Sequence, residues 1–116
     1  MSTKFTTRQA GEVTIVDPDG SVTIGQDAIG LGNTLRELAK SGHKKVLLNL
    51  AVVSYMDSAG IGEMVSGLTT IANHGGIMKL MNLNKNVQTL MKITHLNSIF
   101  EIHDEEGKAL ASFGAA

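Results

Sequence analysis

The stretch VLLNLAVVSYMDSAGIGEMV, from Val46 to Val65, changes its hydrophobic pattern in the middle. Its first half is a nearly unbroken apolar run rich in β-branched residues, which predicts a strand buried on both faces of a sheet. In its second half and just beyond, apolar residues recur at spacings of three and four: Ile61, Val65, Leu68 and Ala72. That spacing predicts one face of an amphipathic helix. Asp57 and Ser58 therefore lie at a junction between a strand and a helix that begins at Ser58.

This junction has a definite chemistry. The first turn of a helix leaves backbone N–H groups unpaired and carries the positive end of the macrodipole, and both Asp57 and Ser58 are residue types that can cap it. Gly60, Gly62 and Gly67 follow, each costing a helix about 1 kcal/mol relative to Ala, which favours a close approach by another backbone. A hydroxyl here is also suited to accept a phosphate, because the helix end favours the added negative charge.

The composition limits the classes of function. The 116 residues carry a formal net charge of −1 and no cysteine, and the length fits one domain over 1–116. The even spread of charge gives no basis for binding nucleic acid or an anionic membrane, and the missing thiols exclude disulfides and thiolate metal sites. No apolar run has the length of a signal peptide or a membrane span. We expect a soluble, cytoplasmic protein without a cofactor.

Outward from the central stretch, strand and helix patterns alternate along the chain. The predicted elements are a hairpin of strands over 3–9 and 12–17, a helix over 25–40, the strand over 46–53, a helix over 58–73, a strand over 77–83, a helix from 84 to about 95, a short strand over 99–102 and a final helix from 104. The order predicts an α/β fold, a central mixed sheet of about four strands with helices packed on it, mainly parallel after the hairpin.

Turn and cap signals mark the ends of these elements. The segment Asp17-Pro18-Asp19-Gly20 predicts a tight turn after the hairpin. Side chains expected to cap helices are those of Asp27, Asn84 and Asp104. Glycines expected to end helices are Gly42 and the pair Gly75-Gly76.

No pattern of catalytic or metal-binding residues accompanies Ser58. The four histidines are scattered without the spacing of a metal site: His43, His74, His95 and His103. Ser58 lacks the G-x-S-x-G elbow of a hydrolase nucleophile, and the glycine pairs lack the full spacing of a dinucleotide-binding loop. We therefore expect neither an enzyme nor a metal protein.

One face of the helix after Ser58 is a potential partner surface. Most methionines are expected to fill the core, but Met56 and Met64 flank the start of this helix. The residues on the side away from the apolar stripe are Ala59, Gly62, Glu63, Ser66 and Thr70. Ordinary solvation would account for this face, whereas its low charge and small side chains favour a partner surface with Ser58 at its edge.

These residues together resemble a STAS domain of the anti-sigma factor antagonist family. The resemblance covers nearly the whole chain, including the opening hairpin, Leu48-Asn49-Leu50 and Gly75-Gly76. Its most specific part is Met56-Asp57-Ser58-x-Gly60-Ile61-Gly62 within the run from Val53 to Gly62.

The resemblance implies a function for Ser58. In that family the serine after the aspartate is phosphorylated by an anti-sigma factor that is also a serine kinase. The unphosphorylated protein binds this anti-sigma factor and releases the sigma factor, and a metal-dependent serine phosphatase resets the serine. Asp57 would help to shape the site for the kinase. Thr23 stands where members often carry Asp, so the partner preference is expected to differ, and Ala59 replaces a common second hydroxyl.

Two hypotheses result. In the first, Ser58 is the phosphoacceptor of a regulatory binding module, and the partner surface consists of Met56, Asp57, Ala59, Gly60, Gly62, Glu63, Ser66 and Thr23. In the second, the protein is a constitutive STAS scaffold or ligand-carrying module, as in stressosome subunits or lipid-transport components, and Ser58 is only a helix cap. They differ in whether Ser58→Asp abolishes partner binding. The oligomeric state stays open.

Overall fold

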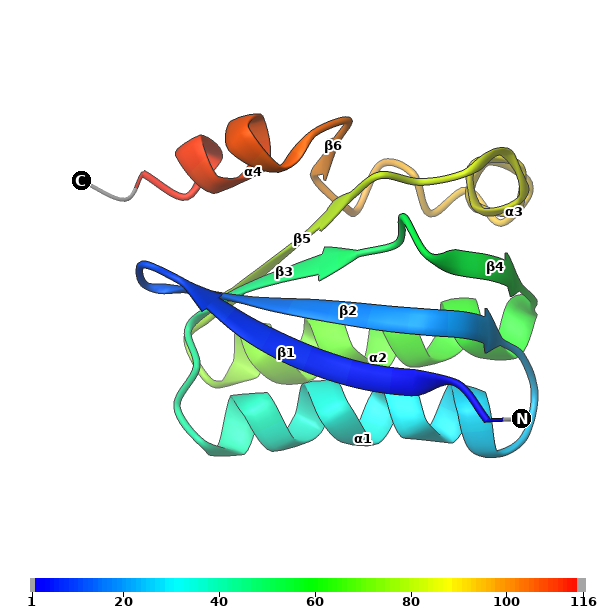
Figure 1. Cartoon of the computed structure of the whole chain (residues 1–116), viewed down its shortest axis with the longest axis horizontal. Helices are drawn as coiled ribbons and strands as arrows, with labels where there is room; N and C mark the ends of the chain where they lie inside the picture. Colours follow the sequence, from blue (N-terminus) through cyan, green and yellow to red (C-terminus); the bar gives the residue numbers. More distant parts are fainter. Residues whose placement is uncertain (1, 115–116) are drawn as a thin grey trace.

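A computed structural model describes residues 2–114, which form a six-stranded mixed sheet and four helices (Figure 1). The antiparallel pair β1 (Lys4–Ala10) and β2 (Val13–Val22) opens the chain. Parallel to β2 run β3 (Lys45–Asn49), β5 (Ile77–Met81) and β6 (Ile102–His103), giving the order β1-β2-β3-β5-β6. The short β4 (Val53–Met56) pairs only with the far end of β2. The predicted α/β class is confirmed, with more strands than the expected four.

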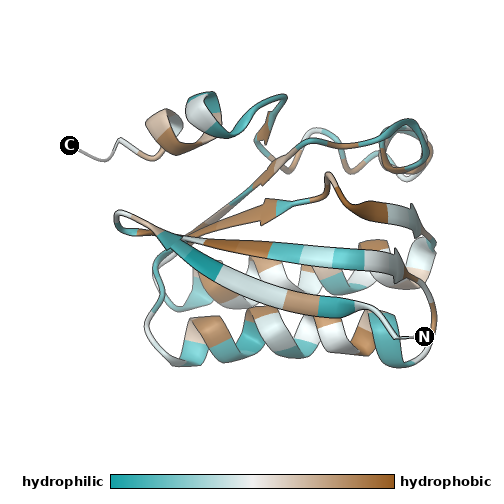
Figure 2. Cartoon of the chain, viewed as in Figure 1, coloured by the Kyte–Doolittle hydropathy of each residue, from teal (hydrophilic) through white to brown (hydrophobic). Residues whose placement is uncertain are grey.

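The helices cover the two faces of the sheet unequally. Three of them, α1 (Gln26–Lys40), α2 (Ser58–Asn73) and α3 (Lys85–Ile93), contribute to one large apolar cluster with the strands. The short α4 (Glu106–Ser112) packs on the opposite face, in a smaller cluster. Figure 2 shows the hydrophobic residues concentrated on β3 and the first half of β2, whereas the edge strand β1 is largely hydrophilic. In β3, Val46, Leu47 and Leu48 are fully buried, as its continuous apolar run predicts.

The predicted turn at Asp17-Pro18-Asp19-Gly20 is wrong, because β2 runs straight through it. Pro18 is buried and lies opposite Phe5 in the β1–β2 register. On its other side, β2 pairs with β3 up to Val16 and with β4 from Gly20. Pro18 therefore falls between two parallel pairings, where its missing N–H interrupts neither ladder. Gly20 supplies a positive φ of 129° at the irregularity.

The single strand predicted over 46–53 is in fact divided between β3 and β4. The Asn49 side chain accepts a hydrogen bond from the Ala51 N–H at 3.1 Å, and the Val53 N–H donates to the Leu50 carbonyl at 3.2 Å. These bonds form a turn that leaves Val52 54% exposed. The turn changes the direction of the chain, so that β4 pairs with the far end of β2. Asp57, which follows β4, therefore lies at the end of the sheet.

Two of the three predicted helix caps differ from the structure. Asn84 caps α3, accepting from the Val87 N–H at 2.9 Å, as predicted. Gly25 is the N-cap of α1, and Asp27 instead accepts from the Thr3 N–H in its first turn. For α4 the N-cap is Glu105 rather than Asp104, without a side-chain bond. The predicted glycine ends are confirmed, since Gly42 and Gly75 both have positive φ.

The apolar stripe of α2 is rotated from its predicted position. Ile61 is buried as expected, but Ala72 is exposed, and Met64 and Ile71 reach the core instead. Val65 and Leu68 are only partly buried. The rotation results from α1, which packs along α2 and covers the side that includes Gly67.

A buried lysine anchors α4 to the sheet. The Lys79 ammonium group donates to the Ser112 carbonyl at 2.8 Å, lies 3.0 Å from the Glu101 carboxylate and is 4.6 Å from the centre of the Phe113 ring. Glu101 also contacts the His103 ring at 2.6 Å. Hydrogen bonds from His103 and Lys79 hold the pKa of the Glu101 carboxyl down at about 2, against an ordinary value of 4.5.

We expect Glu101→Gln to change the acid dependence of stability. Because the folded protein depresses the pKa of Glu101, its stabilising effect is present above the ordinary value and is lost as pH falls from about 4.5 to about 2. The variant should therefore melt below the wild type at neutral pH, with a difference that shrinks in acid. Thermal unfolding across pH tests this, with the exposed Asp104→Asn as control. A difference that stays constant with pH would contradict it.

Candidate functional site

The junction between β4 and α2 is held together by Asp57. One carboxylate oxygen of Asp57 accepts from the Gly60 N–H at 3.1 Å and so caps α2. The other accepts from the Ile24 N–H at 2.9 Å, in the loop between β2 and α1. Hydrogen bonds from these backbone N–H groups lower the pKa of the Asp57 carboxyl, and the bond from Ile24 has the largest effect. Asp57 is therefore charged at neutral pH. One carboxylate thus ties the start of α2 to the neighbouring loop.

Ser58 is the first residue of α2 and is exposed to solvent. Asp57 rather than Ser58 caps the helix, which decides between the two predicted caps. Among residues 2–114 no hydrogen bond involves the Ser58 hydroxyl. The Ser58 hydroxyl is therefore exposed at a helix N-terminus and forms no hydrogen bond with the described residues.

The two stretches of sequence that build the Ser58 turn contain no lysine or arginine. No lysine or arginine occurs between Lys45 and Lys79, or between Arg8 and Arg36. These two ranges contain β4, the first turn of α2 and the β2–α1 loop. Asp57 adds a negative charge next to Ser58. A phosphate on Ser58 would therefore find no cation in the segments that build the site.

The three glycines of α2 differ in their surroundings. A Cβ on Gly60 would collide with the Val22 carbonyl, and one on Gly67 would lie 2.9 Å from Leu35 Cβ. A Cβ on Gly62 would meet no atom within 4 Å. Packing inside the chain thus explains Gly60 and Gly67. Gly62 is exposed in the middle of a helix, with no internal contact to account for it.

Glu63 and Ser66 of the predicted surface lie at the seam between α1 and α2. The Glu63 carboxylate is 3.3 Å from the Arg36 guanidinium, which also donates to the Ser66 hydroxyl at 3.4 Å. Both residues remain partly exposed. Ala59 is likewise half-buried, and Thr23 lies in the loop beside Ile24, where its carbonyl accepts from the Ala28 N–H.

Two residues of the predicted partner surface are buried and cannot contact a partner directly. Met56 is 0% exposed, because its side chain points from β4 into the main core. Gly60 is buried against Val22 and against Met56 itself, with Met56 Cγ 2.6 Å from the position of a Cβ. Met64, expected beside them, is also fully buried. These residues support the exposed turn from below.

The structure adds residues that the sequence patterns did not predict. Ile24 is 82% exposed beside the Asp57 carboxylate that fixes its backbone. On the other side, Asn84 donates to the Val53 carbonyl at 2.7 Å and the Asn86 amide oxygen accepts from the Met56 N–H at 2.8 Å. The two asparagines thereby hold the outer edge of β4. No local signal predicts these contacts, which join residues about thirty positions apart.

We expect Asp57→Ala to destabilise the fold by about 1–2 kcal/mol, since it removes the α2 cap and the bond to the Ile24 N–H. Asp57→Asn should cost less, because an amide oxygen can still cap the helix. Urea unfolding measures both changes, and Asp19→Ala, an exposed carboxylate on β2, is the control. Wild-type stability in Asp57→Ala would show that the two hydrogen bonds contribute little.

Other kinds of site are not found in the part of the chain that the structure describes. Within residues 2–114 there is no group of three or more histidines and carboxylates able to hold a metal ion. None of the helices there combines the length and hydropathy that crossing a bilayer requires.

Comparisons with known proteins agree with this geometry. A family model described as the STAS domain matches residues 4–109. A Thermotoga neapolitana protein named as a candidate anti-sigma factor antagonist is 34% identical over 74 residues, which are 64% of this chain and 66% of that protein. The anti-sigma-B factor antagonist of Bacillus subtilis is 42% identical over 50 residues, 43% of this chain and 46% of that protein. The matched stretches thus span about two thirds and under half of these relatives.

The fold is shared over a longer range than the sequence. The crystal structure of a candidate anti-sigma factor antagonist from Thermotoga maritima has a TM-score of 0.87 and 26% identity, covering 96% of this chain and 95% of that one. These comparisons confirm the resemblance and the fold class predicted from the sequence. They also agree with the expectation of a regulatory protein rather than an enzyme.

Proposed function

The chain belongs to the STAS domain family, and from this premise we propose that it is an anti-sigma factor antagonist switched by phosphorylation of Ser58. Unphosphorylated, it binds an anti-sigma factor that is also a serine kinase, and the sigma factor is released. Phosphorylation ends this binding, and a metal-dependent serine phosphatase restores it. Such a protein acts in the cytoplasm, on proteins rather than on nucleic acid or membrane.

The freedom of the Ser58 hydroxyl carries this proposal. A kinase needs an accessible hydroxyl, and Ser58 is exposed at the first position of α2. Because Asp57 already caps the helix, modification of Ser58 breaks no capping bond. The helix N-terminus also tolerates the added charge. Capping by Asp57 favours this proposal over the alternative of a constitutive scaffold in which Ser58 is only a helix cap.

The charge around Ser58 indicates how the switch would work. Phosphorylation adds about two negative charges beside the ionised Asp57, in segments without lysine or arginine. These segments therefore contain no cation that could pair with the phosphate, and they have no electrostatic reason to rearrange around it. It remains on the surface, where a bound partner would have to desolvate it. We infer direct repulsion and desolvation at the interface, without a large conformational change.

The proposed partner surface surrounds Ser58 on two elements. From α2 it includes Ala59, Gly62, Glu63 and Ser66, and from the β2–α1 loop it includes Thr23 and Ile24. Asp57 shapes the surface through its bond to the Ile24 N–H. Ile24 is the most exposed large apolar residue described, at 82%, and an exposed aliphatic group beside small residues fits the apolar centre of a protein interface.

An ATP-release experiment tests the proposal. Wild-type protein and Ser58→Ala are immobilised and used to capture partners from an extract of the cells that make this protein, and ATP with magnesium is then added. We expect release from the wild type, with phosphate mapped to Ser58 by mass spectrometry, and retention on Ser58→Ala. Ser54→Ala, an exposed serine on β4, should behave as the wild type. Retention on all three proteins would support the scaffold alternative instead.

A further inference from the structure

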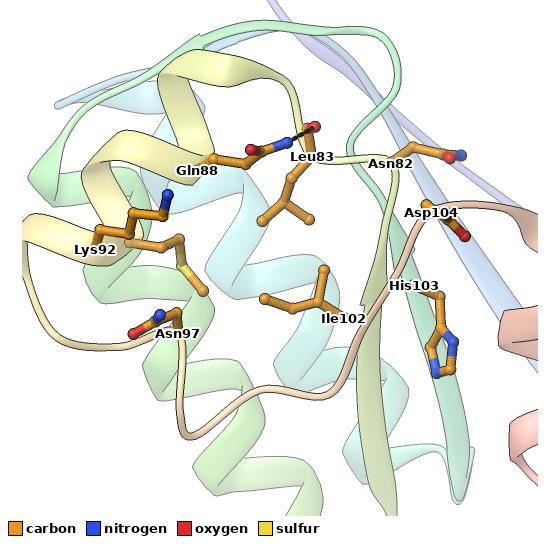
Figure 3. Close-up of a pocket in the computed structure, with 9 residues that line it drawn as sticks. Asn82, Leu83, Gln88, Lys92, Asn97, Ile102, His103 and Asp104 are labelled. Atoms are coloured by element: carbon orange, nitrogen blue, oxygen red, sulfur yellow. Dashed lines mark hydrogen bonds between the residues drawn. The ribbon is translucent and has the colours of Figure 1, made fainter.

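A groove of about 850 Å³ opens at the carboxyl ends of β5 and β6, beside α3 (Figure 3). Its volume falls in the range of about 300–1,000 Å³ that is typical of sites for small organic molecules. The groove is distinct from the Ser58 surface, since its lining comes from the segment after β5, from α3 and from the end of β6. Nothing in the proposed switch makes use of it.

The groove lies where the chain changes sides of the sheet. After β5 the chain forms α3, whose Val87 and Met91 belong to the same apolar cluster as α1 and α2. After β6 it forms α4, whose Ala109 packs on the opposite face. In open α/β sheets, ligands bind in the crevice outside the carboxyl ends of the strands. The groove opens at that end of β5 and β6, between segments that leave for opposite faces of the sheet.

The lining combines an apolar floor with one available positive charge. Leu83 and Ile102 point toward one another in Figure 3, and the buried Met91 also lines the groove. Lys92, on the α3 side, forms no ion pair with any residue in 2–114. Two other lining residues already have partners, since the His103 ring lies 2.6 Å from the Glu101 carboxylate and the Asp104 carboxylate lies 3.8 Å from the Lys108 ammonium group.

The backbone at the edge of the groove is strained. Asn82 adopts a positive φ of 62°, which is uncommon for a residue other than glycine. A hydrogen bond from its side chain to the Asn49 amide oxygen, at 3.0 Å, helps to hold this conformation. Such conformations persist where the surrounding structure fixes them and are concentrated at ligand sites. The strained residue thus agrees with the topology in marking this crevice.

We propose that the groove binds a small organic carboxylate with an apolar body. The carboxylate lies against the Lys92 ammonium group, and the body packs on Leu83, Met91 and Ile102. The amide side chains of Gln88 and Asn97, which also line the groove, can bond to polar groups of the ligand. This site is independent of Ser58, so it does not depend on the proposed switch.

The test uses para-trifluoromethylbenzoate and its neutral amide as a matched pair of probes. Binding to the purified full chain is followed by fluorine NMR, and the site is mapped by backbone amide shifts. We expect the carboxylate to bind about fivefold more tightly than the amide, with shifts at Gln88, Lys92 and Ile102. Lys92→Met should remove this preference, because it removes the ammonium group that pairs with the carboxylate. The fold should tolerate the change, since Lys92 is exposed. Lys40→Met, an exposed lysine at the end of α1, should retain it.

Three results would overturn the proposal. They are no detectable binding of either probe, shifts confined to residues outside the groove, and an unchanged preference in Lys92→Met. Because this experiment contains no partner protein, a negative result would not bear on the proposed phosphorylation switch at Ser58.

Discussion

Replacing Ser58 by Asp is expected to weaken binding of the proposed anti-sigma factor partner about a thousandfold while the protein stays folded. A carboxylate at this position must be desolvated beside Asp57, and β4, the first turn of α2 and the β2–α1 loop contain no lysine or arginine to compensate it. A penalty of about 4 kcal/mol corresponds to this loss of affinity. The fold itself should tolerate the change, since a negative charge in the first turn of a helix is favourable.

Titration calorimetry with the purified anti-sigma factor measures this effect, alongside thermal unfolding of each variant. Ser58→Asn is the matched control, because it has nearly the shape of Asp without the charge. We expect Ser58→Asn to lose far less affinity than Ser58→Asp, and neither variant to melt below the wild type. Equal affinity of the Asp and Asn variants would show that charge at this position does not control binding.

The parts of this fold that could be predicted from the sequence are those that local chemistry decides. The change in hydrophobic period after Met56 marks the start of α2, and Asn84 and Gly75 have the expected roles at helix ends. Each depends on residues within one turn of one another. Asp57 and Ser58 could be placed at the helix N-terminus for the same reason, since they are adjacent to the point where the hydrophobic period changes.

The sequence does not predict the conformation of a residue where a distant segment determines it. Pro18 predicts a turn by itself, yet it occupies a strand because β1 pairs with β2 on one side while β3 and β4 share the other. Met56 was expected at the surface, but β4 crosses above the main core and directs this side chain inward. The Glu63–Arg36 pair and the Asn86 contact to β4 likewise depend on how helices pack. Position on a helical wheel cannot reveal which neighbour covers a face.

The glycines of α2 provide a second, independent test, in which stability and binding should change separately. Gly62→Ala should raise the free energy of unfolding by about 1 kcal/mol, because it removes a glycine from an exposed helix position where a Cβ meets no other atom. Gly67→Ala should lower it by up to about 3 kcal/mol, since its Cβ would press against Leu35 of α1.

Binding should follow the reverse order. If Gly62 is kept because a partner backbone lies against it, the added methyl group separates the two surfaces, and we expect at least about a tenfold loss of affinity in Gly62→Ala. Gly67 lies at the α1–α2 seam, so the folded fraction of Gly67→Ala should bind as the wild type does. Urea unfolding and calorimetric titration of both variants measure the two quantities.

A glycine that lowers stability without an internal contact needs an explanation outside the chain. Gly60 and Gly67 have such contacts, with Val22 and Leu35, whereas Gly62 has open space around it, one turn along α2 from Ser58. A more stable Gly62→Ala that binds less tightly would locate the partner within contact distance of this turn. Unchanged affinity would instead move the interface toward the β2–α1 loop, and Ile24 would then become the residue to replace first.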